Sequence, residues 1–92
     1  MWWIFGVSRG GPMRAEIVRI LHERPYNANQ LSQVLKVDYK TIRYHLNILL
    51  RNNVLTSLEE GNIIAYFISD VMEEQYPLFQ EICEKLKEDS SC

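Results

Sequence analysis

The sequence predicts one mainly helical α+β domain, and three observations support this expectation. The chain has 92 residues, 47% of them hydrophobic and 24% charged, which is the composition of a globular protein with length for a single core. Apolar residues recur at helical spacing in three segments before residue 54 and in one after residue 69. Two β-favouring runs flank a turn that contains glycine. We therefore expect a three-helix core, a β-hairpin and a C-terminal helix, in that order.

The chain divides into three parts. Residues 1–11 form an apolar N-terminal extension, residues 12–69 the domain itself, and residues 70–92 a C-terminal helical segment. The apolar run in the extension is far shorter than the roughly 20 residues of a membrane span, and no basic residue precedes it as in a secretory signal. A cytoplasmic protein without a membrane partner is expected. Trp2 and Trp3 are expected to pack on the domain or across a dimer interface, with a monotopic membrane anchor as the alternative.

Two helices are expected before residue 38. The first covers residues 12–24, because Pro12 suits the first turn of a helix and Pro25 stops it. The second begins after Asn27, whose side chain can accept a hydrogen bond from a free amide while Gln30 reaches back as a capping box. A tight connection then leads to the third helix.

The third helix, residues 39–53, follows Asp38, which is placed to cap it. Its apolar residues fall in one narrow arc: Ile42, Leu46 and Leu49, with Leu50 beside them. The opposite side carries hydrogen-bond donors and no carboxylate: Lys40, Tyr44, Asn47 and Arg51, with Arg43 at the edge. An ordinary surface helix mixes glutamate with its cations, so this donor face favours an anionic partner.

A β-hairpin is expected next, with strands at residues 54–58 and 63–68. Its tip reads Glu59, Glu60, Gly61 and Asn62, where Gly61 can take the positive φ of a tight turn. Ser69 or Asp70 then caps the final helix, which should be broken or kinked around residues 76–77. That helix carries an apolar stripe of Leu78, Phe79, Ile82 and Leu86.

The charge is divided along the chain. Residues 1–58 hold eight basic and three acidic residues, for a net charge of +5, while residues 59–92 hold two basic and nine acidic residues, for −7; together they give the overall −2. A polyanion would therefore be attracted to the N-terminal two-thirds and repelled by the remainder. Charge alone also fits a basic face that is only solvated.

The order of helix, short helix, tight turn, long helix and hairpin is that of a winged helix-turn-helix domain, in which the long helix enters the major groove of DNA. The donor face fits this role, since lysine, arginine and asparagine can bind phosphates and base edges. Helix N-termini attract anions, so Arg9, Arg14, Asn27 and Gln30 are further candidates for phosphate contacts.

The segments 27–31 and 37–49, with the stretch Tyr44-His45-Leu46 and then Leu49, resemble the helix-turn-helix of ArsR-type transcriptional regulators. The resemblance covers residues 12–69. It implies that the hairpin is the wing, that the terminal helices build a symmetric homodimer, and that five residues contact DNA: Lys40, Thr41, Arg43, Tyr44 and Asn47. The dimer interface would then hold Trp2, Trp3 and the apolar stripe of the last helix, while His45 would lie at the edge of the core.

Two departures limit what the resemblance implies. Metal-sensing members carry cysteines in the first helix of the motif, and residues 29–32 contain none, so no metal site or cofactor is expected there. The wing tip is acidic where many members are basic. Either the wing stands off the DNA, or Gly61 and Asn62 approach it through backbone and amide while the glutamates point outward.

No catalytic arrangement is evident, so an enzyme is not expected: the sequence has no nucleophile with a plausible base and no glycine-rich phosphate loop. The function expected is that of a sequence-specific, homodimeric regulator of transcription that binds double-stranded DNA, with its effector unknown. A winged-helix module that binds only other proteins is the alternative. A third possibility makes Cys83 a redox or ligand switch, although free thiols are expected of both cysteines.

Overall fold

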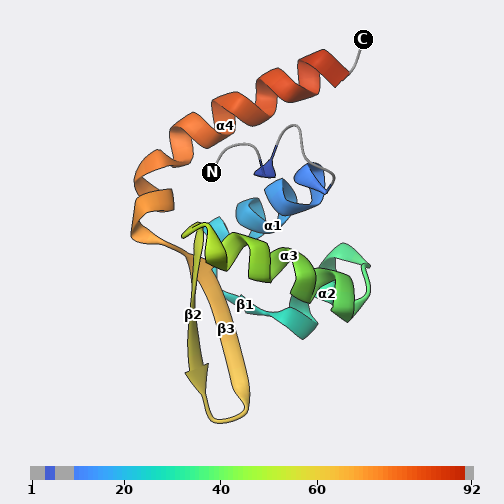
Figure 1. Ribbon diagram of the computed structural model, residues 1–92, viewed down its shortest axis with the longest axis vertical. Coiled ribbons are helices and arrows are strands. Elements are labelled where there is room, and N and C mark those ends of the chain that lie inside the picture. Colours follow the sequence, from blue (N-terminus) through green and yellow to red (C-terminus); the bar gives the residue numbers. More distant parts are fainter. Residues whose placement is uncertain (1–3, 6–9, 91–92) are drawn as a thin grey trace.

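The computed structural model describes residues 4–5 and 10–90, with side chains through residue 85 (Figure 1). Its elements are α1 (Gly11–Glu23), β1 (Tyr26–Asn27), α2 (Ala28–Leu35), α3 (Tyr39–Arg51), β2 (Leu55–Glu60), β3 (Ile63–Ile68) and α4 (Asp70–Ser90). The strands form an antiparallel sheet in the order β1-β3-β2. The mainly helical α+β fold with a hairpin wing and a C-terminal helix is confirmed.

Two side-chain caps fix where the helices of the helix-turn-helix begin. The amide of Gln30 donates to Asn27 Oδ1 at 2.7 Å, and the amide of Asn27 donates to Gln30 Oε1 at 2.9 Å, which completes the expected capping box at α2. At α3 the amide of Thr41 donates to Asp38 Oδ2 at 3.0 Å. Each cap satisfies amides that have no partner within their helix. Both expected caps are therefore confirmed.

One hydrophobic core lies between α1, α2, α3, the sheet and α4, and it also holds residues 4–5. Its fully buried members include one residue of α1, one of α2 and three of α3: Ile17, Leu31, Ile42, Leu46 and Leu49. The three residues of α3 are those that the sequence placed in one arc. Their burial fixes which side of α3 faces outward.

The sheet differs from the expectation in two respects. The two-residue strand β1 pairs with β3, with Tyr26 opposite Tyr66, and was not anticipated because so short a segment has no period to detect. Strand β2 also continues through Glu60, which pairs with Ile63, so only Gly61 and Asn62 turn. Gly61 has a φ of 63°, as the tight turn requires.

Helix α4 is capped by Ser69, whose hydroxyl accepts from the amide of Met72 at 3.1 Å and donates to the carbonyl of Asn53 at 2.7 Å. The sequence predicts a break or a kink around residues 76–77, and the chain stays helical through Pro77, so the break is wrong. Figure 1 shows the first turns of α4 set at an angle to its long C-terminal arm, as a proline kink produces. Where α4 docks, its Tyr76 stacks on His22 of α1 with ring centroids 3.6 Å apart.

Candidate nucleic-acid interface

The outward side of α3 is open in the part of the chain that the structure describes. Tyr44 is 59% exposed. The other exposed residues of this face are Lys40, Asn47 and Arg51, and two more, Thr41 and Arg43, are half-buried at its edge. We call these six residues the donor face. The expected contact residues of the third helix therefore lie on one accessible surface without a carboxylate among them.

Asp38 is the nearest acid to this surface, and its charge is engaged by the helix. The hydroxyl of Thr41 donates to Asp38 Oδ1 at 2.7 Å, beside the bond from the Thr41 amide to Oδ2. These hydrogen bonds, the side-chain one first, hold the pKa of Asp38 below its usual value. The hydroxyl of Thr41 has thus used its proton and offers a ligand only its lone pairs.

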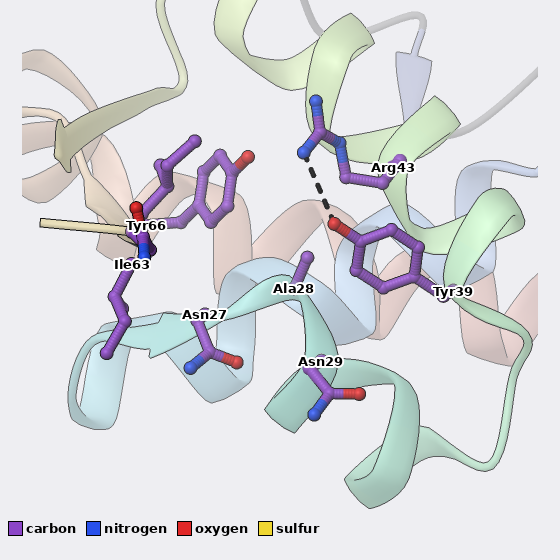
Figure 2. Close-up of a pocket in the computed structure, with 9 residues that line it drawn as sticks. Asn27, Ala28, Asn29, Tyr39, Arg43, Ile63 and Tyr66 are labelled. Atoms are coloured by element: carbon purple, nitrogen blue, oxygen red, sulfur yellow. Dashed lines mark hydrogen bonds between the residues drawn. The ribbon is translucent and has the colours of Figure 1, made fainter.

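A pocket of about 180 Å³ separates the start of α2 and α3 from the wing (Figure 2). It is lined by Asn27, Ala28, Asn29, Tyr39, Arg43, Asn62, Ile63, Ile64 and Tyr66. Arg43 supplies its positive charge, and Nη1 of Arg43 donates to the phenol of Tyr39 at 3.4 Å. The pocket brings together three expected site residues from three elements, namely Asn27, Arg43 and Asn62. Sequence reasoning missed Tyr39 and Asn29, which only the packing of α2, α3 and β3 places beside them.

Arg14 lies in the core, where it is 2% exposed, so its expected contact with phosphate is wrong. Its Nε donates to the carbonyl of Ile4 at 2.8 Å, and its Nη1 lies 3.1 Å from Nδ1 of His45. On α1 it shares the inward side with Ile17, Val18 and Leu21, which are also buried. That spacing was the signal in the sequence that could have placed Arg14 inside.

His45 is buried directly behind the donor face. Burial lowers its pKa, and the positive charge of Arg14 lowers it further. Because a guanidinium can only donate, Nδ1 of His45 must accept, which requires a neutral imidazole with its proton on Nε2. The helix therefore presents Tyr44 to solvent and a neutral histidine to the core at successive positions.

Comparison with known proteins identifies the class of this interface. The family model described as "Bacterial regulatory protein, arsR family" matches residues 11–57. The chain belongs to the ArsR family. Among curated protein sequences, none matches the chain.

Solved structures share the fold of this ArsR-family chain. A transcriptional regulator homologue from Pyrococcus horikoshii OT3 has a TM-score of 0.74 and 20% identity, over 90% of this chain and 87% of that one. The regulator HlyU from Vibrio vulnificus CMCP6 gives 0.66 and 21%, over 77% and 75%. The homodimeric winged helix-turn-helix DNA-binding domain Mb0332 from Mycobacterium bovis, a possible ArsR-family regulator, gives 0.71 and 16%, over 78% and 68%. The chain is thus a DNA-binding regulator of transcription with a winged helix-turn-helix, from a family of bacterial regulatory proteins.

The residues expected at a dimer interface are only partly placed. Leu78 of the ArsR-family chain is 46% exposed and Ile82 is half-buried, so both have surface on α4. Phe79 is fully buried in its own chain, with its ring edge-on to Phe5 at 5.0 Å, and has no surface to offer a second copy. The structure does not describe Trp2, Trp3, Arg9 or the side chain of Leu86.

The described residues of this ArsR-family chain contain neither a metal-binding group nor a helix that could span a membrane. Residues 4–5 and 10–90 hold no group of three or more histidine, cysteine or acidic side chains that could bind a metal ion. In the same residues, every helix is too short or too polar to cross a bilayer. Cys83 is buried in the core cluster.

Proposed function

We propose that the chain acts as a homodimer that binds specific sites on double-stranded DNA, with α3 of each protomer in successive major grooves. The observation that carries this proposal is the donor face, which is accessible and free of carboxylates along the whole length of α3. A major groove about 12 Å wide admits a helix of this kind. Two protomers related by a twofold axis would read half-sites whose centres lie about 34–36 Å apart, or a multiple of that distance.

The residues of the donor face divide into two roles. Asn47 can pair with the edge of an adenine through its amide, and Arg43 with guanine O6 and N7, so both would specify sequence. Lys40 and Arg51 are exposed near opposite ends of α3, where they would bind the phosphates that flank the groove. Tyr44 and Thr41 complete the surface, the latter through its lone pairs.

The start of α2 would bind the DNA backbone. The side-chain oxygens of Asn27 and Gln30 accept the hydrogen bonds of the capping box. Their side-chain amide nitrogens are therefore the groups that can donate outward. A helix N-terminus also carries partial positive charge, which favours a phosphate beside it. These two residues thus complete a phosphate-binding edge next to the pocket.

The wing would contact DNA through its turn. Adjacent residues of a strand point to opposite faces, so Glu59 and Glu60 of β2 cannot both face a duplex. Gly61 and Asn62 form the turn between the strands and can approach the backbone through a peptide N–H and a side-chain amide. We infer that the wing reaches the duplex edge with these two residues and turns at least one of its two carboxylates away from the phosphates.

Helix α4 would hold the homodimer together. Val71 and Leu78 are about half exposed at a spacing of two helical turns, and Ile82 continues the same stripe. A chain of 92 residues buries a smaller fraction of its surface alone than a larger domain does, which favours association. The homodimeric state of the Mb0332 domain supports the same assembly. We also propose a cytoplasmic location, since a regulator of this bacterial family would meet its DNA there.

Selection of bound fragments from genomic DNA, followed by titration of variants, tests the proposal. Lys40→Ala should weaken binding to selected and unrelated DNA by a similar factor, because a phosphate contact carries no sequence information. Asn47→Ala should weaken binding to the selected site by about 1–3 kcal/mol and leave unrelated DNA unaffected. Gln80→Ala, an exposed polar residue on α4, is the matched control and should bind as wild type.

Two outcomes would contradict the proposal. If no fragment is enriched, or if Lys40→Ala and Asn47→Ala both bind as wild type, α3 is not the reading element. Binding of an acidic protein in place of DNA would instead support the interaction module.

A further inference from the structure

A buried polar cluster joins the first residues of the chain to the recognition helix α3. It consists of Arg14 on α1, His45 on α3, Gly10 at the start of α1 and the carbonyl of Ile4. Arg14 donates from Nε to Ile4 at 2.8 Å, and its Nη1 reaches Nδ1 of His45 at 3.1 Å. One guanidinium therefore connects a segment before α1 with the residue that lies behind the donor face.

A cation in this place is costly to the fold. Transfer of a charge into a protein interior carries a penalty of several kcal/mol, and a hydrophobic side chain of similar size is often as stable or more stable there. Ile4, Ile17 and Phe79 are among the apolar residues of the same core. Methionine or leucine at position 14 would thus pack in this core without a charge. The guanidinium is therefore explained by its hydrogen bonds to Ile4 and His45.

Gly10 shows how closely the cluster is fitted together. Its φ is 85°, and its carbonyl accepts the amide of Arg14 at 3.0 Å. A Cβ at this position would lie 2.7 Å from Cε1 of His45 and 3.1 Å from Nη1 of Arg14, inside van der Waals contact. The backbone of Gly10 therefore packs directly on the imidazole of His45 and the guanidinium of Arg14. Neither side chain can shift toward this backbone.

We propose that Arg14 is a positioning residue for DNA binding: through His45 it fixes the rotation of α3 about its own axis, and so the direction in which the donor face points. His45 is next to Tyr44, with the two rings edge-on at 5.3 Å, and two positions from both Arg43 and Asn47. A roll of α3 at His45 would move all three contact residues together. This inference depends on the proposed function, because it concerns how α3 meets the duplex.

The state of His45 gives the proposal a signature that a purely structural cation would lack. The charged or titratable groups that face it among the described residues are Arg14 from α1 and Tyr44 from its own helix, while Gly10 and Ile4 contribute backbone. Protonation of Nδ1 would replace the acceptor of Arg14 with a second donor and a like charge. DNA affinity should then fall as the solution is made acidic enough to protonate His45.

The first arm of the test compares substitutions at position 14. Arg14→Met removes the hydrogen bonds, and Arg14→Lys keeps the charge but replaces the two-nitrogen fork with a single nitrogen on a shorter chain. The control is Arg19→Met on the same helix, which removes a half-exposed cation that pairs with Glu16. Affinity for a selected DNA site is measured at neutral pH and corrected for the folded fraction seen by circular dichroism.

We expect Arg14→Met and Arg14→Lys to bind at least about fivefold more weakly, a factor typical of coupling between separate sites, and Arg19→Met to bind as wild type. If folded Arg14→Met binds as wild type, the proposal is overturned. If Arg14→Lys binds as tightly as wild type, the positive charge suffices and the two-nitrogen geometry of the guanidinium is not needed. That result would also overturn the proposal.

The second arm uses the two histidines of the chain and carries the test if the Arg14 variants do not fold. His45→Gln keeps an acceptor for Arg14 that does not titrate, and His22→Gln, at an exposed site on α1, is its control. Wild type and His22→Gln should lose affinity as the pH falls from about 8 to below the ordinary histidine value of about 6.5, while His45→Gln should bind equally across this range. The same pH profile in His45→Gln as in wild type would overturn the proposal. Failure of the wild-type protein to bind any DNA at neutral pH would instead refute the proposed function.

Discussion

DNA binding by the proposed dimer should depend on salt with a slope that the structure sets. Lys40 and Arg51 are the cations of the donor face that are assigned to phosphates, whereas Arg43 is assigned to a base and Arg14 is excluded because its guanidinium is in the core. If Lys40 and Arg51 each contact one phosphate in each protomer, about four contacts give a slope of log affinity against log salt of about −3.6. Between about 50 and 200 mM salt, affinity should then fall on the order of 10²-fold. Counting Arg14 as well would give a slope of about −5.4 and a fall on the order of 10³-fold.

Fluorescence anisotropy with a labelled duplex measures this slope directly in KCl. Lys40→Ala should reduce the slope by about 2 for a dimer, one contact in each protomer. Arg14→Met should lower the affinity and leave the slope unchanged, because Arg14 acts within the core. A wild-type slope near zero would refute phosphate contact by the donor face, and a slope near −5.4 that Arg14→Met reduces by about 2 would refute the buried position of Arg14.

Three further predictions concern the fold that supports the interface. Asn27→Ala should lower the free energy of unfolding in urea by about 1 kcal/mol through loss of the α2 cap, whereas Asn29→Ala, exposed two residues further along the chain, should change it by less than about 0.5 kcal/mol. Equal effects would contradict the role of the capping box. Gly10→Ala should lower the free energy of unfolding by about 1–3 kcal/mol, and by more than Gly61→Ala lowers it. Both positions have positive φ, but only a Cβ at Gly10 would meet neighbouring atoms. The free energy of unfolding should also fall as the pH drops through about 6.5, since the unfolded chain takes up a proton that burial and Arg14 keep from His45, and the loss should level off below the lowered pKa of His45. A similar fall in His45→Gln between pH 8 and 5.5 would contradict that assignment.

Features that depend on neighbouring residues were predictable from the sequence. The capping box requires only Asn27 and Gln30 three residues apart, and Asp38 as an N-cap residue predicts the start of α3 from local sequence alone. The donor face also follows from spacing, because Ile42, Leu46 and Leu49 can be buried together on only one side of a helix.

Features that depend on packing between distant segments were not predictable from the sequence. Strand β1 exists because β3 offers Tyr66 and Ala65 as partners, and two residues alone carry no strand pattern. Arg14 was counted as a surface cation because charge is the usual sign of exposure, yet its partners, Ile4 and His45, lie 10 and 31 residues away. Helix α4 likewise continues through Pro77, although local rules predict that a proline breaks or kinks a helix.

Asn27 serves two elements at once, since it ends β1, which pairs with β3 of the wing, and caps α2. A force applied to the wing tip can therefore pass along β3 and through Asn27 to the start of the helix-turn-helix, beside the direct contacts of α1 and α2 with β3. This shared residue restricts separate movement of the two parts of a protomer that flank the pocket. In the proposed dimer, operators of unequal shape would then be accommodated mainly by bending of the duplex or by movement between protomers.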